Sequence, residues 1–184
     1  MIPGPLSVRE CEVLAQHAAD TSAERALEVG HYLGLSTAVL LEALPASCEL
    51  VTIDHHQGDQ WCPATSADEF LANVEPYVGG RTFTFVNDDM RSALPALDGR
   101  FGFVFYDADH TAEAVADFWT LAVGLLEPDC TLIFDDADWE DQSTLVGLAE
   151  SAGFVSVRSE PFVRGDDDKR DQRTYTLEVM RRSR

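Results

Sequence analysis

The segment Arg25–Asp54 constrains the fold more than any other part of this sequence. An apolar run, Ala26–Val29, leads into a turn with Gly30 and Gly34, a helix-compatible stretch follows, and a second apolar run ends at Asp54. Glycines let the backbone approach a ligand closely, and a helix N-terminus presents free N–H groups. An acid at the end of the next strand can accept hydrogen bonds from ribose hydroxyls. The segment therefore predicts a strand, glycine loop, helix, strand and acid that together bind a nucleoside.

The spacing of the glycines narrows the class of nucleoside. The loop reads Glu-x-Gly-x-x-x-Gly from Glu28 to Gly34, and not the G-x-G-x-x-G of dinucleotide enzymes, which disfavours a NAD-dependent dehydrogenase. It also lacks the Lys-Ser/Thr pair with which a P-loop holds triphosphate and Mg²⁺. We therefore expect a nucleoside without a diphosphate, and S-adenosylmethionine fits best.

The charge of the chain limits its partners. Thirteen Lys and Arg residues stand against 33 Asp and Glu residues, which gives a formal net charge of −20. Such a surface repels phosphate backbones and anionic lipids, so nucleic acid and membranes are disfavoured as partners. We expect a small-molecule substrate.

Length and cysteine usage point to one intracellular domain. The 184 residues suit a single α/β domain, with an N-terminal helix in 1–22, a core in 23–139 and antiparallel strands in 153–184. The four cysteines are scattered without a C-x-x-C pair, which suits a reducing compartment. No signal peptide or membrane-spanning run is visible. A cytoplasmic location is expected.

Strand-like and helix-like segments alternate along the chain. The strand candidates are short and almost continuously apolar, as in a parallel sheet covered on both faces: Leu27–Val29, Leu50–Ile53, Phe83–Val86, Phe103–Tyr106 and Thr131–Phe134. Helices are predicted at Ser7–His17, Ser36–Leu44, Ala67–Tyr77, Thr111–Leu126 and Gln142–Ala152, the first with a capping box. Phe154–Val157 and Tyr175–Met180 read as an antiparallel pair, with Gly165–Lys169 near its tip. The alternation predicts a Rossmann-like, doubly wound, mostly parallel sheet of seven strands.

Acidic residues follow nearly every predicted strand. Asp107, Asp135 and Asp136 come after strands that should be neighbours, so their carboxylates can converge. Ligands of open α/β sheets bind at this edge, and a hard divalent cation (Mg²⁺, Mn²⁺ or Ca²⁺) would relieve the repulsion of such a cluster. The alternative is that the acids cap the following helices, since Asp109 and Asp138 precede two of them.

Histidines lie at the same edge. His110 follows Asp107 on one loop and could take a proton at physiological pH, or it could simply face solvent at a helix start. His55 follows the acid expected to bind ribose, so we expect it near the cofactor. His31, inside the glycine loop, is expected to shape the turn.

Four motifs in order, ALEVGHYLGLST, VTID, FVFYDADH and LIFDDADW, resemble those of class I S-adenosylmethionine-dependent methyltransferases. Within that class the chain is similar to the small metal-dependent O-methyltransferases of catechols, caffeoyl thioesters and natural-product sugars. The resemblance covers most of the chain, and the order of the motifs makes it specific. It implies the following roles. Cofactor-binding residues would be Glu28, Gly30, Gly34, Ser36, Asp54, His55, Asp88, Asp89, Met90 and Asp107. Metal ligands would be Asp107, Asp135 and Asp136, and His110 would be the catalytic base beside Asp107.

The resemblance implies in-line transfer of the sulfonium methyl group to a small-molecule hydroxyl. Two alternatives stay open: a metal-independent N- or C-methyltransferase, and a non-catalytic nucleoside-binding module. Trp61, Trp139 and Tyr106 are candidates to flank the substrate. The segment Gln57–Ser66, or the second subunit of a homodimer, is a candidate to complete the pocket.

Overall fold

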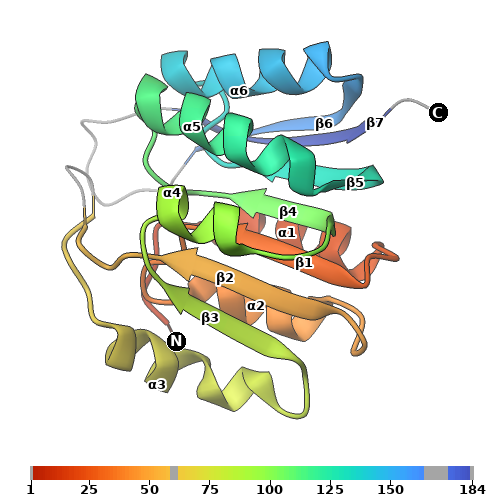
Figure 1. Cartoon of the computed structure of the whole chain (residues 1–184). Helices are drawn as coiled ribbons and strands as arrows, with labels where there is room; N and C mark the ends of the chain where they lie inside the picture. The colour runs from red at the N-terminus through yellow and green to blue at the C-terminus, as the bar shows by residue number, and fades with distance from the viewer. Residues whose placement is uncertain (1, 59–61, 164–173, 183–184) are drawn as a thin grey trace.

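A single mixed sheet organises the chain in the computed structural model, which describes residues 2–58, 62–163 and 174–182 (Figure 1). Within these ranges the sheet has seven strands in the order β3-β2-β1-β4-β5-β7-β6. The strands are β1 Arg25–Val29, β2 Glu49–Asp54, β3 Phe83–Asn87, β4 Phe101–Tyr106, β5 Leu126–Phe134, β6 Phe154–Val163 and β7 Thr174–Arg182. The first five are parallel, and β7 runs antiparallel to both of its neighbours. The predicted doubly wound sheet is confirmed.

Helices cover both faces of the sheet. The α-helices are α1 Val8–Ala19, α2 Leu35–Ala43, α3 Ala67–Val78, α4 Met90–Ala93, α5 Ala112–Ala122 and α6 Glu140–Ser151, with 3₁₀ turns η1 Leu94–Ala96 and η2 Val123–Leu125. One apolar core lies between the sheet and α1, α2 and α3, and the other between the sheet and α4, α5 and α6. The capping box of α1 is confirmed, because Ser7 and Glu10 each bond the other's backbone N–H.

The central strands are formed by the apolar runs that predicted them. Every residue of β4 is buried, and Val29 of β1 lies opposite Tyr106 of β4 in the parallel register. Because the strands are covered on both faces, they need apolar side chains at successive positions and not at alternate ones. The same register aligns the carboxyl ends of β1, β2, β4 and β5, which places the following loops along one edge.

Several boundaries differ from the prediction. The strand β5 begins at Leu126, before residues 127–129, which are two acids and a proline. A register irregularity between Phe101 and Phe103 of β4 accommodates them. The helix predicted over Thr111–Leu126 ends at Ala122 and continues as a 3₁₀ turn. The helix α4 was not predicted, because four residues are too few to show a helical period.

The C-terminal antiparallel pair is confirmed and is longer than predicted. The ladder pairs Phe154 with Arg182 at one end and Val163 with Thr174 at the other. The predicted tip at Gly165–Lys169 lies outside the described residues. Every helix in the described part of the chain is too short or too polar to cross a bilayer.

Candidate active site

The loops at the carboxyl ends of the parallel strands border a cavity of about 410 Å³. Most of the residues predicted to form the site line it: Gly30, Ser36, Asp54, His55, Asp88, Asp89, Met90, Asp107, His110, Asp135 and Asp136. Glu28 and Gly34 are not among the described lining residues. Ligands of open α/β sheets bind at this edge, so the cavity is the candidate active site.

The turn after β1 depends on Gly30. Its φ is +85°, and its N–H donates to the carbonyl of Ile53 at 2.9 Å. A Cβ on this residue would lie 2.0 Å from the carbonyl oxygen of Asp107. Only glycine fits here, because the loop after β1 passes directly against the loop after β4.

Gly34 lies where two helices pack closely together. It is the N-cap of α2 with φ +95°, and a Cβ here would lie 2.5 Å from Cγ1 of Val74 on α3. The glycine therefore allows α2 and α3 to pack closely. Its direct contact with a cofactor stays a prediction.

Glu28 lies fully buried beneath the glycine loop. The hydroxyls of Thr37 and Thr52 donate to its Oε2 at 2.6 and 2.8 Å. Burial raises the pKa of Glu28 to about 7, against the lowering effect of the hydroxyls of Ser36, Thr37 and Thr52. Glu28 thus joins β1 to α2 and β2, and its contact with a cofactor also stays a prediction.

Asp54, the predicted ribose acid, joins two loops. Its Oδ2 accepts from the backbone N–H groups of His31 and Tyr32, both at 3.0 Å, and its Oδ1 accepts from that of His56 at 2.8 Å. Burial acts to raise the pKa of Asp54, but the nearby His31 and these N–H donors outweigh it and lower the pKa. A carboxylate has about four acceptor positions, so these bonds leave room for a ligand hydroxyl.

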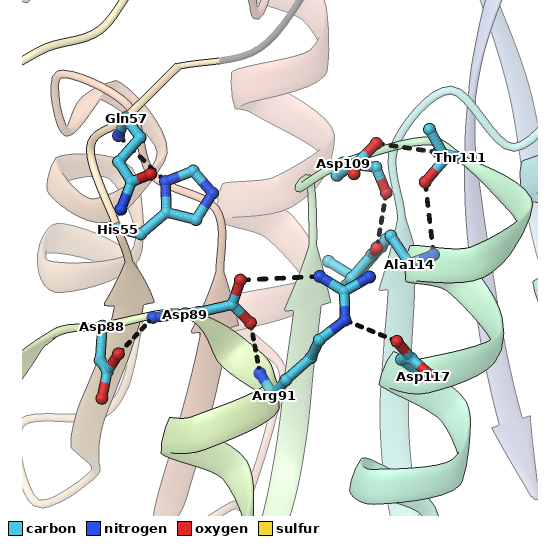
Figure 2. A network of polar contacts seen from close by, with 10 residues as sticks. His55, Gln57, Asp88, Asp89, Arg91, Asp109, Thr111, Ala114 and Asp117 are labelled. Carbon is cyan, nitrogen blue, oxygen red and sulfur yellow. Dashed lines mark hydrogen bonds and ion pairs between the residues drawn. The ribbon is translucent and has the colours of Figure 1, made fainter.

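The loop after β3 presents Asp88, Asp89 and Met90 to the cavity. Asp89 is the N-cap of α4 and accepts from the N–H of Arg91 at 2.7 Å. The guanidinium of Arg91 lies between Asp89, at 3.6 Å, and Asp117 of α5, at 2.5 Å (Figure 2). Met90 is buried, so α4 offers an apolar side chain beside two acids.

The loops after β4 and β5 form the opposite wall. The N–H of Asp135 donates to the carbonyl of Tyr106 at 3.0 Å, which ties the two strand ends together. Asp135 and Asp136 are buried, and Asp136 has a φ of +51°. Nε2 of His110 lies 3.4 Å from Oδ2 of Asp136, and its ring centroid lies 5.1 Å from that of Trp139, which also lines the cavity. His110 and Asp136 thus lie within ion-pair distance of each other at the cavity wall.

The three predicted metal ligands, Asp107, Asp135 and Asp136, all line the cavity. In the described conformation their side chains are not arranged as a metal centre. Among residues 2–58, 62–163 and 174–182, no group of three or more His, Cys, Asp or Glu side chains is arranged to hold a metal ion. The metal therefore stays a prediction.

Asp89 caps α4, and in the loops after β4 and β5 the described contacts show one further bond of this kind. Thr111 is the N-cap of α5 and accepts from the N–H of Ala114, while Asp109 accepts from the N–H of Thr111 at 3.0 Å (Figure 2). The N-cap of α6 is Trp139, and not Asp138. The N-caps of α5 and α6 are thus Thr111 and Trp139, and not the acids at positions 107, 135 and 136.

Some residues of the site were missed or misplaced by sequence reasoning. The segment Gly4–Leu6 lines the cavity, and Arg91 does so too, although nothing in the local pattern indicated either. Tyr106 is a core residue, because it packs on Phe118 at 4.2 Å and donates to the carbonyl of Asp109. Trp61 lies outside the described residues.

Comparisons with known proteins agree with this geometry. A methyltransferase domain family model matches residues 27–137, which is more than half of the chain. The chain therefore belongs to the methyltransferase domain family, and the resemblance to class I S-adenosylmethionine-dependent methyltransferases is confirmed. A comparison with curated proteins gives no match.

Solved structures share the fold over nearly the whole chain. Cofactor-bound Rv0187 from MTB is 21% identical with a TM-score of 0.73, over 99% of this chain and 84% of that one. An O-methyltransferase from Bacillus cereus in complex with SAH is 17% identical, with a TM-score of 0.74 over 97% and 84%. The O-methyltransferase TomG from Streptomyces achromogenes, involved in tomaymycin synthesis and solved with SAM, is 19% identical, with a TM-score of 0.70 over 97% and 82%.

Proposed function

We propose that the protein transfers the methyl group of S-adenosylmethionine to a hydroxyl of a small molecule. The observation that carries this proposal is one cavity with the Gly30 turn and Asp54 on one side and the His110–Asp136 pair on the other. The O-methyltransferases from Bacillus cereus and Streptomyces achromogenes share the fold and support the same reaction class.

The cofactor would lie along the loops after β1, β2 and β3. The methionine moiety would bind at Gly30 and Ser36, the ribose at Asp54 and His55, and the adenine beside Met90 and its neighbouring acids. The close approach of Gly30 to the opposite loop and the remaining acceptor capacity of Asp54 support this order. The cationic sulfonium would be stabilised by the acidic wall that includes Asp107.

His110 would act as the base. Bound S-adenosylmethionine would supply an electrophilic methyl carbon, with a neutral thioether as the leaving group. His110 would accept the proton that the acceptor hydroxyl loses. Asp136, 3.4 Å from Nε2 of His110, would stabilise the imidazolium that forms. The cavity walls would hold the acceptor hydroxyl next to the methyl group.

A divalent cation is a separate part of the proposal. Asp107, Asp135 and Asp136 would hold it, and it would lower the pKa of the acceptor hydroxyl; oxygen ligands favour Mg²⁺, Mn²⁺ or Ca²⁺. Metal-independent transfer, to oxygen, nitrogen or carbon, is the second candidate. It is favoured by the finding that the described side chains form no group that could hold a metal ion.

Composition supports the proposed partners and the proposed location. The net charge of −20 supports a small-molecule acceptor over nucleic acid or an anionic membrane. The four cysteines are free, which supports a reducing, cytoplasmic location. Assembly as a homodimer is part of the proposal, with its test in the oligomeric state in solution.

Calorimetric titration with S-adenosylhomocysteine and a methyl-transfer assay test the function. We expect binding, and turnover with members of a panel of phenols, catechols and sugar hydroxyls that exceeds turnover with matched amines. Loss of turnover in EDTA would support the metal-dependent reaction, whereas full activity would favour the metal-independent one. Absence of S-adenosylhomocysteine binding would contradict the assigned class, and binding without any turnover would revive the non-catalytic module.

A further inference from the structure

We propose that His31 and His56 are positioning residues for the cofactor, because a buried hydrogen-bonded chain through their rings holds the loop after β1 to the loop after β2. The proposal rests on the proposed cofactor site, which these two loops would form.

The hydrogen-bond network is continuous from Thr65 to Glu28. Oγ1 of Thr65 lies 2.9 Å from Nδ1 of His56, and Nε2 of His56 lies 3.3 Å from Nε2 of His31. Nδ1 of His31 lies 2.6 Å from Oγ1 of Thr52, which donates to Oε2 of Glu28 at 2.8 Å. The hydrogen-bond network therefore runs from the segment that precedes α3 to the buried end of β1.

The hydroxyl at Thr52 sets the direction of these bonds. It has one proton, and that proton goes to Glu28, so Oγ1 of Thr52 must accept from Nδ1–H of His31. Nε2 of His31 then carries no proton and accepts from Nε2–H of His56. Nδ1 of His56 in turn carries no proton and accepts from the hydroxyl of Thr65. One pair of neutral tautomers thus satisfies every contact, an assignment that follows from the network of partners.

The surroundings favour these neutral rings. The His31 ring stacks on Phe70 with centroids 3.8 Å apart, and the His56 ring meets Phe85 edge-on at 5.7 Å. Both side chains are buried, and burial lowers the pKa of each. Two buried imidazoles that share one hydrogen bond need one ring to donate and the other to accept. A change of tautomer at either ring would therefore break the bond between them.

The two histidines also hold Asp54 through their backbones. The N–H of His31 donates to Oδ2 and that of His56 to Oδ1, so ring and backbone contacts close a cycle between the loops. His56 has a φ of +57°, and Tyr32, which follows His31, has a φ of +49°. A non-glycine residue keeps such a conformation only where its surroundings hold it. The ring contacts therefore add to the backbone bond from Gly30 to Ile53 in holding the loop after β1 against Asp54.

Thr52 gives the sharpest test, because it is fully buried and is not among the described residues that line the cavity. We compare Thr52→Val, which keeps the shape and removes the hydroxyl, with Thr52→Ser, which keeps the hydroxyl. We expect Thr52→Val to raise the Kd for S-adenosylhomocysteine and the KM for S-adenosylmethionine on the order of tenfold, with kcat at saturation changed less than twofold. Thr52→Ser should restore the Kd to within about threefold of the wild type.

Thr65→Val and Thr65→Ser repeat the comparison at the other end of the hydrogen-bond network. They test the positioning role of the two histidines if Thr52→Val does not fold. Thr52 and Thr65 belong to one hydrogen-bond network. The double valine variant should therefore raise the Kd for S-adenosylhomocysteine by less than the product of the two single effects. Valine variants with a lowered Tm and an unchanged Kd would overturn the proposal, since a purely structural role predicts that result. Failure of the wild type to bind S-adenosylhomocysteine would overturn the proposed function and this inference together.

Discussion

Gly30 and Asp107 lie so close that a Cβ on residue 30 would be 2.0 Å from the carbonyl oxygen of residue 107. The N–H of Asp107 also donates to the carbonyl of Val29 at 2.9 Å, so the contact is part of the strand pairing. This contact joins the cofactor half of the cavity to the half that holds the acids and His110.

Replacement of Gly30 by alanine should therefore destabilise the fold and the site together. Both the clash and the φ of +85° oppose a side chain, so we expect a loss of at least about 2 kcal/mol in the free energy of unfolding. Binding of S-adenosylhomocysteine should weaken as well. Denaturant unfolding and calorimetric titration measure the two effects.

The matched control is Gly147→Ala on α6, where a Cβ would meet nothing within 4 Å. Alanine is the better helix former, so this variant should be as stable as the wild type or up to about 1 kcal/mol more stable. Equal behaviour of the two variants would contradict the close approach at Gly30.

Replacement of Glu28 by glutamine should change how stability depends on pH. The pKa of Glu28 is about 7 in the folded protein, above its ordinary 4.5, so the folded state binds the proton more tightly than the unfolded state. The free energy of unfolding therefore loses this contribution as the pH rises from about 4.5 to about 7. An amide does not ionise, yet its oxygen can still accept from Thr37 and Thr52.

We expect the stability of Glu28→Gln relative to the wild type to increase between pH 5 and pH 8 by an amount on the order of 3 kcal/mol. Chemical denaturation at a series of pH values measures the difference, and groups that titrate equally in both proteins cancel. A difference that does not vary with pH would mean that Glu28 titrates normally.

Replacement of His110 by glutamine should remove the proposed base and leave the cofactor site intact. We expect kcat to fall by about 10²–10⁴-fold, with the Kd for S-adenosylhomocysteine within about twofold of the wild type. His17→Gln on α1, away from the cavity lining, is the control and should retain activity. Retained turnover in the His110 variant would assign the proton transfer to another group.

The metal proposal has a test that does not depend on turnover. If Asp135 helps to hold a divalent cation, Mn²⁺ should raise the Tm of the wild type in a concentration-dependent way, because a ligand that binds the folded state stabilises it. The Asp135→Ala variant should lose this shift, whereas Asp129→Ala, at an exposed position on β5, should keep it. No shift in the wild type would favour the metal-independent reaction.

The fold could be predicted because most of its strands and helices have a local signal in the sequence. Apolar runs such as Leu50–Ile53 match buried parallel strands, and Ser7 with Glu10 marks the start of α1. Residues at strand ends could be assigned to the cavity for the same reason, since parallel strands end at one edge. The extent of β5 and the presence of α4 could not be predicted, because pairing and packing with distant segments decide them.

The sequence by itself determined the order of strands and helices, the edge of the sheet that carries the site, and the acids and His110 that follow its strands. Hydrophobic periodicity and the direction of parallel strands are sufficient for these features. Only the tertiary structure decided that Gly34 faces α3, that Asp54 joins two loops, and that His31 meets His56. These depend on contacts between residues far apart in the chain, and spacing along a sequence carries no measure of such distances.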